Sequence, residues 1–216
     1  MKSAFYRVTI FILFVFSVSC QKDNIEFQHL ILILQPDETY GNDAVINSVY
    51  PESNYGKLPD IHLYAATEGG RSYLNRVAIT FDISKIPDDA KIDSAFLSLY
   101  FNSNSYYGNE HKGENGFTIR RIVSSWDENT ITWNTQLVAT YQNEVYVPKS
   151  STPTQDFIDI NITNLVQDIV DNRDLSYGFL LLLQEETPYK ILLFASSNNS
   201  NRSLRPKLAV YYTIQK

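Results

Sequence analysis

Two alternating apolar segments, 76–81 and 95–101, limit most strongly what this chain can fold into. In both segments apolar residues occupy every second position. Alternation with a period of two indicates a β-strand with one buried face. Pro87-Asp88-Asp89 lies between the segments and favours a turn. We therefore predict two long strands, joined by a short connection, at the centre of one antiparallel sheet.

Shorter segments with the same character follow one another along the rest of the chain. Strands are expected at 27–34, 61–64, 117–123, 157–161, 177–184, 190–195 and 207–214. Leu165, Val166, Ile169 and Val170 share one helical face, which predicts one short helix. Short strands separated by frequent turns favour a sandwich of two antiparallel sheets, and 27–216 is expected to form one all-β domain.

The N-terminus has the pattern of an export signal. Residues 1–19 combine a basic start with an apolar run that is short for a membrane span, and small residues precede Cys20. This pattern resembles the lipobox of bacterial lipoproteins, in which the cysteine is acylated, for example with palmitate, and becomes the new N-terminus. The alternative is an ordinary signal peptide with an incidental cysteine. Residues 20–26 are then expected to be a tether.

Several segments together resemble a known family. They are RVAITFDISKIPDDAKIDSAFLSLYF at 76–101, Asn54-Tyr55-Gly56, Trp126-Asp127-Glu128 and Arg205-Pro206-Lys207-Leu208. In their order along the chain they resemble the DNRLRE domain, also classed as carbohydrate-binding module family 96. The resemblance implies a jelly-roll β-sandwich that binds polysaccharide, with acidic glycans such as alginate as the expected class. Thr80, Asn161 and Ile169 depart from the family pattern.

Aromatic and basic residues near loops are the candidates for ligand binding. Aromatic rings pack on the apolar faces of sugars, while charged and amide groups bind hydroxyls or carboxylates. The long polar segment 102–116 has the length of a functional loop. The candidates are Arg71, Tyr73, Arg76, Tyr106, Tyr107, Arg120 and Trp126. The alternative is scattered surface charge, with Arg76 paired to a carboxylate and with the rings of Trp126 and Trp133 pinning a loop.

Catalytic and metal-binding signatures are sparse in the sequence. It contains no nucleophile elbow, no phosphate-binding loop and no zinc-type helix. His29, His62 and His111 lie in separate segments, and each is expected to be a surface or sheet residue. Calcium would suit the oxygen atoms of sandwich loops, but no loop has regularly spaced acidic residues, so the sequence names no calcium ligand. The net charge of −6 disfavours nucleic-acid binding.

These observations give three functional hypotheses. The first is an exported, lipid-anchored protein of a Gram-negative outer membrane, facing the periplasm or the cell surface, whose module binds polysaccharide without catalysis or a cofactor. The second is a structural or adhesive surface subunit that binds a protein partner. The third is a polysaccharide lyase that uses tyrosine as an acid and arginine or histidine to neutralise a uronate, although nothing in the sequence places these residue types together.

Overall fold

The computed structural model describes residues 26–36, 42–135 and 137–216, and this part of the chain folds into eleven strands, one α-helix and three single 3-10 turns. The strands are β1 Phe27–Leu34, β2 Asn42–Asn47, β3 Asp60–Glu68, β4 Arg71–Thr80, β5 Lys91–Leu99, β6 Phe117–Ile122, β7 Ala139–Val147, β8 Phe157–Asn161, β9 Phe179–Leu183, β10 Lys190–Ala195 and β11 Lys207–Gln215. The α-helix is α1 Thr163–Asp171, and the 3-10 turns are η1 Trp133–Thr135, η2 Arg173–Leu175 and η3 Arg202–Leu204.

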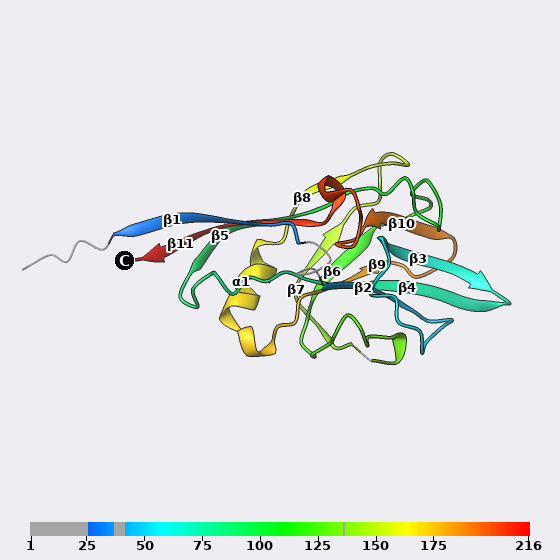
Figure 1. Cartoon of the computed structure of the whole chain (residues 1–216), viewed down its shortest axis with the longest axis horizontal. Helices are drawn as coiled ribbons and strands as arrows, with labels where there is room; N and C mark the ends of the chain where they lie inside the picture. Colours follow the sequence, from blue (N-terminus) through cyan, green and yellow to red (C-terminus); the bar gives the residue numbers. More distant parts are fainter. Residues whose placement is uncertain (1–25, 37–41, 136) are drawn as a thin grey trace, which may run out of the picture.

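The strands form two antiparallel sheets that face each other (Figure 1). Sheet A has the order β1-β11-β5-β8, and sheet B has the order β10-β3-β4-β9-β6-β7, with β2 also paired to β4. Every pair in both sheets is antiparallel. This architecture confirms the predicted all-β sandwich of two antiparallel sheets with one short helix.

Two details of the sequence-based prediction were wrong. The strands predicted to pair in one sheet, β4 and β5, belong to different sheets, and the connection 81–90 crosses between them. Alternation reports which side of a strand is buried, and both strands do bury one side, but it does not report the partner strand. Strand β7 is absent from the strands expected from the sequence. It is an edge strand, and its middle residues, 141–143, are polar and exposed, so the alternation of buried residues is weak there.

The core lies between the sheets and is built from the buried sides of both. Strand β9 is buried at all five positions, as expected for a strand covered on each face. Helix α1 contributes Leu165, Val166, Ile169 and Val170 to this core, as predicted from their common face. The helix contacts β5 of sheet A as well as β6 and β7 of sheet B, so it closes the sandwich between them.

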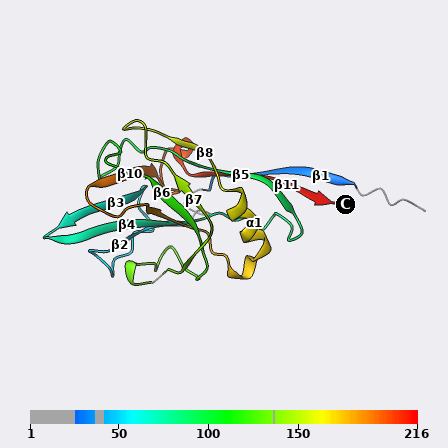
Figure 2. The same cartoon turned by 180° about the vertical axis from the view of Figure 1, so that it is seen from behind.

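The two ends of the molecule differ. Strands β1 and β11 reach away from the body at one end, whereas the β3–β4 hairpin projects at the other (Figures 1 and 2). The predicted signal peptide, Cys20 and most of the tether lie outside the described residues. In the described part of the chain, no helix is long and apolar enough to span a membrane.

Candidate functional site

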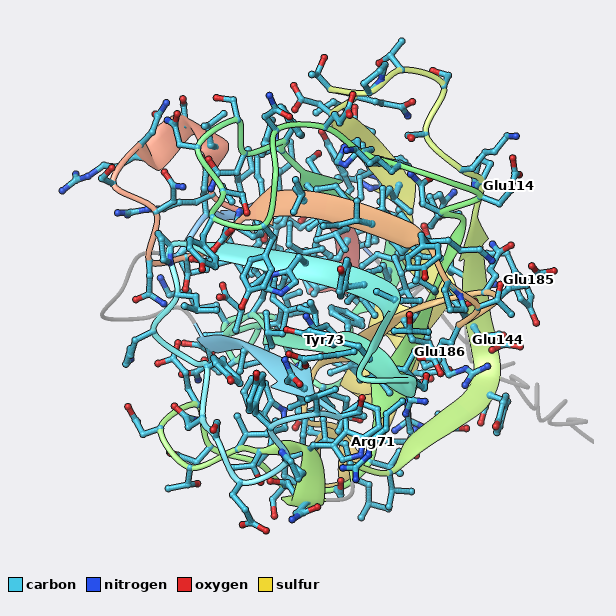
Figure 3. The ribbon with its side chains drawn as sticks, turned by 90° about the vertical axis from the view of Figure 1, so that its right-hand side faces the viewer. Arg71, Tyr73, Glu114, Glu144, Glu185 and Glu186 are labelled. Atoms are coloured by element: carbon cyan, nitrogen blue, oxygen red, sulfur yellow. The ribbon has the colours of Figure 1, made fainter. Side chains whose placement is uncertain are left out.

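A cluster of tyrosines lies where the β3–β4 hairpin meets the loop 102–116. The ring of Tyr64 in β3 packs edge-on against that of Tyr73 in β4, with centroids 5.0 Å apart. From the loop, Tyr106 and Tyr107 pack edge-on at 5.5 Å. Tyr106 is 94% exposed, so its ring is free to meet a ligand. Figure 3 looks onto this end of the molecule and shows Tyr73 near the middle of the view.

A pocket of about 200 Å³ opens beside these rings. Its lining includes Tyr64, Tyr107, Tyr189 and Ile191, together with Gly108, Glu110, Lys112 and Lys190, and we call it the tyrosine pocket. Tyr189 is 71% exposed, and its hydroxyl lies 3.1 Å from the hydroxyl of Thr67. The pocket therefore offers three aromatic rings and their hydroxyl groups to a ligand.

The loop that carries Tyr107 is held in place by His111. The buried ring of His111 accepts a hydrogen bond at Nδ1 from the backbone N–H of Leu193, at 3.1 Å. Its Nε2 lies 2.9 Å from the carbonyl oxygen of Gln155, to which it donates because Nδ1 is the acceptor. Burial lowers the pKa of His111, which favours this neutral form. Lys112 and Ile191 also exchange two backbone hydrogen bonds of 3.0 Å, so the loop is fixed to β10.

His62 lies beneath Tyr107 and is entirely buried. The two ring centroids are 3.7 Å apart, and neither nitrogen of His62 has a hydrogen-bond partner among the described residues. Burial lowers the pKa of His62 to about 3, and burial also raises the pKa of Tyr107 to about 12. Both groups are therefore uncharged near neutral pH, and His62 has no surface with which to touch a ligand.

The charges around the tyrosine pocket are already balanced. Lys112 lies 2.9 Å from Glu110, and the buried ammonium of Lys190 donates to the carbonyl and carboxylate oxygens of Glu185 at 2.9 and 3.1 Å. An anionic ligand would have to compete with these carboxylates for the two lysines. The ring of Tyr189, in contrast, is largely open to solvent.

A second cluster lies on sheet B, around Arg76 of β4. Its guanidinium donates two hydrogen bonds to the carboxylate of Glu186, at 2.7 and 2.8 Å, and lies 5.0 Å above the ring of Trp133. The bond to Glu186 raises the pKa of Arg76. A pocket of about 150 Å³ lies here and is lined by Ile46, Arg76, Trp133, Leu137 and Leu180.

Arg120 of β6 lies on the same side of sheet B. Both Arg120 and Ala78 are opposite Leu180 in the register, and Arg76 is two residues from Ala78, so all four point to one face. Arg120 Nε donates to the carboxylate of Glu144 at 2.7 Å, and its guanidinium lies 4.1 Å above the ring of Tyr141. We call the set Arg76, Arg120, Trp133 and Tyr141 the arginine face.

Comparison with known protein families identifies the family of this chain. The family model for carbohydrate-binding module family 96 matches residues 37–212, which is more than four fifths of the chain. The chain belongs to this family. No curated protein matches the sequence of this carbohydrate-binding module.

The structure divides the sequence-based candidates of the module into separate groups. Tyr106 and Tyr107 lie together with Tyr73 nearby, whereas Arg76 and Arg120 belong to the arginine face. Arg71 is exposed at the start of β4, opposite Glu68 across the hairpin.

Trp126 is engaged inside the protein. Its indole N–H donates to the carbonyl oxygen of Tyr177 at 2.7 Å, and its ring packs against a cluster of buried residues that includes Ile122 and Ile131. Trp133 packs against the same cluster and also lies beneath the guanidinium of Arg76. This geometry agrees with the alternative interpretation, in which both rings pin the loop.

Sequence reasoning missed Tyr64 and Tyr189 of the tyrosine pocket, as well as Tyr141 of the arginine face. The alternation Ile61-His62-Leu63-Tyr64 could have indicated that His62 and Tyr64 share a side. No local signal marks Tyr189, because it approaches Tyr64 only through the pairing of β10 with β3, in which Ile191 is opposite Tyr64. No group of three or more His, Cys, Asp or Glu residues in the described ranges is arranged to hold a metal ion.

Proposed function

We propose that this family 96 module binds polysaccharide without catalysing its cleavage, and that the tyrosine pocket is its binding site. The observation that carries the proposal is the gathering of Tyr64, Tyr107 and Tyr189 around one open pocket in a chain of this family. Sugar rings present apolar C–H faces that pack on aromatic rings, while their hydroxyls exchange hydrogen bonds with tyrosine hydroxyls.

The charge balance bears on which polysaccharide binds. Lys112 and Lys190 supply positive charge to an acidic glycan only if it displaces Glu110 and Glu185 from them. Such displacement is feasible for Lys112, which is exposed, and costly for Lys190, whose side chain is only 7% exposed. We therefore propose that the tyrosine rings provide most of the binding affinity and that the acidic groups of the glycan pair with Lys112 rather than with Lys190.

The non-catalytic part of the proposal is supported by the state of the two groups that would serve a lyase. His62 is sealed beneath Tyr107, and its depressed pKa keeps it neutral. Tyr107 holds its proton tightly because burial raises its pKa to about 12. A general acid or base works best with a pKa near the operating pH, and neither group meets this condition.

We also propose that the module is exported and anchored to the cell envelope through lipid on Cys20, with the outer membrane as its location. The leader at 1–19 and the small residues before Cys20 support this proposal. A short tether would then join the lipid to β1, which begins at Phe27.

A structural or adhesive role is the second candidate, and one observation favours it. Phe27, Ile31 and Ile33 of the edge strand β1 are 60%, 60% and 63% exposed, and together with Tyr211 of β11 they form an apolar surface. The exposures and the pairing of Ile31 with Tyr211 define this surface. An exposed apolar surface at a sheet edge is typical of a protein-binding site.

Affinity electrophoresis of residues 21–216 against neutral and acidic polysaccharides tests the proposed function. Retardation by one class of glycan is expected, and Tyr189→Ala should weaken it about tenfold or more in Kd. Tyr146→Ala is the matched control, because Tyr146 is similarly exposed, at 66%, but lies on β7 outside the tyrosine pocket.

The same mixtures should be followed by ultraviolet absorbance for unsaturated products. New absorbance would identify a lyase and refute the non-catalytic proposal. Absence of retardation by every glycan would instead favour the protein-binding role of the β1 surface. Equal retardation of wild type and Tyr189→Ala would move the binding site away from the tyrosine pocket.

A further inference from the structure

Three buried oxygen atoms near β2 have no hydrogen-bond partner among the described residues. They are Asp43 Oδ1, Glu128 Oε1 and Ser197 Oγ. Asp43, Glu128 and Ser197 are only 2%, 4% and 1% exposed. A buried oxygen without a partner is costly, and a buried carboxylate oxygen is the most costly of these, so three at one place require an explanation.

The contacts between the three segments show that these residues belong to one site. The backbone N–H of Ser197 donates to Asp43 Oδ2 at 2.7 Å, which leaves Oδ1 of the same carboxylate free. The other Glu128 oxygen, Oε2, bonds to the ammonium of Lys57. Val45 of β2 forms a β-bridge with Tyr55, so the strand that carries Asp43 lies beside the turn that carries Lys57.

The turn 54–57 packs tightly against Glu128 and fixes its position. Asn54 Nδ2 donates to the carbonyl oxygen of Glu128 at 2.8 Å. A Cβ atom on Gly56 would lie 2.2 Å from that carbonyl oxygen and 2.7 Å from Glu128 Cγ, so only glycine fits there. Asn198 Nδ2 donates to the carbonyl of Gly56 at 3.1 Å, which ties the turn to the segment that carries Ser197.

The charge of this site is not balanced. Two carboxylates share one ammonium, and the side chain of Lys57 is 55% exposed whereas that of Glu128 is 4% exposed. A cation beside the unpartnered oxygens would balance the charge of these two buried carboxylates.

We propose that Asp43 Oδ1, Glu128 Oε1 and Ser197 Oγ bind a hard cation of the calcium class. Calcium accepts irregular sets of carboxylate, hydroxyl, carbonyl and water oxygens, whereas magnesium demands a regular octahedron and gives up its water reluctantly. The ammonium of Lys57 is the group that gives way, because its exposed side chain reaches solvent. The site joins β2 to the segments around Gly56, Glu128 and Ser197, so its role is structural and independent of glycan binding.

Thermal unfolding of residues 21–216 in EDTA and in calcium chloride tests the site, with Tb³⁺ luminescence as a direct probe of binding. Calcium at about a hundredfold excess over Kd should raise Tm by roughly 5–10 °C. Tb³⁺ emission excited through tyrosine and tryptophan should rise on binding and fall when calcium is added. Both signals should be lost in Asp43→Asn.

Asp60→Asn is the matched control, because Asp60 is equally buried, at 2% exposure, but its carboxylate accepts from Ser105 and contributes none of the three proposed ligand oxygens. This variant should keep the calcium response. If Asp43→Asn does not fold, Ser197→Ala removes one oxygen with little change in volume and should weaken calcium binding at least severalfold. Wild-type protein that gains no stability from calcium and gives no Tb³⁺ signal overturns the proposal, and so does a calcium response that is unchanged in both Asp43→Asn and Ser197→Ala.

Discussion

Replacing His62 with phenylalanine should flatten the pH dependence of stability below neutral pH. In the folded protein the pKa of His62 is lowered to about 3, because its ring is buried without hydrogen-bond partners among the described residues, whereas the unfolded chain has the ordinary value of 6.5. Between these values the unfolded state binds one more proton than the folded state. The free energy of unfolding therefore falls as the pH falls from 6.5 towards 3.

The size of the effect follows from the two pKa values. Each pH unit in this window lowers the free energy of unfolding by about 1.4 kcal/mol, so the whole window amounts to at most about 5 kcal/mol. Above pH 7 the imidazole is neutral in both states and contributes no slope. Phenylalanine keeps a ring against Tyr107, which lies 3.7 Å from His62, and removes the titration.

Urea unfolding of wild type and His62→Phe at pH 7, 6, 5 and 4 in EDTA measures this contribution. The difference between the two free energies should change by about 1.4 kcal/mol per pH unit below 6, because every other titrating group is common to both proteins. Parallel pH profiles would show that His62 protonates in the folded state at its ordinary pKa. Its burial without partners would then not be the state of the molecule in solution.

Three further changes test separate contacts. Gly178→Ala should cost about 2–4 kcal/mol in urea unfolding, because φ is +100° and the new Cβ would lie 2.4 Å from the carbonyl oxygen of Ile79; an unchanged midpoint would contradict this. Arg76→Ala should cost about 1–2 kcal/mol and shift the fluorescence of Trp133 to longer wavelength, because it removes a paired guanidinium from the indole. Trp126→Phe should lose about 1 kcal/mol with its N–H hydrogen bond but keep full glycan affinity, and a matching loss of affinity would reassign that ring to the binding site.

The sequence predicted the fold well where burial alone decides it. Strand β1 was predicted with its observed ends, and the run of leucines in β9 correctly indicated a strand covered on both faces. The sequence did not reveal which strands pair with each other, because β4 and β5 show the same alternation and yet lie in different sheets. Strand β7 was not predicted, because its middle residues are polar and exposed and show no alternation of apolar residues.

The candidate site was predictable only in part, for a related reason. Tyr106 and Tyr107 lie in a polar loop whose length already indicated a role, and they do reach the pocket end of the module. Tyr189 joins Tyr107 only because β10 pairs with β3, which no local pattern reveals. Residue type alone also could not show that Trp126 donates to the carbonyl of Tyr177, whereas Trp133 lies against Arg76.

The pairing of β1 with β11 has a consequence for how the domain is made. Among the described strands, β1 pairs only with β11, from Phe27 opposite Gln215 to Leu34 opposite Leu208. During synthesis, β1 is made before the other described strands and must wait for residues 207–215 before it can form this pair. Closing a contact between such distant segments is slow, and until then an apolar strand remains exposed to aggregation. The β1–β11 pair is thus completed only after the last strand is made, and a holding chaperone would be needed most by the segment FQHLILIL.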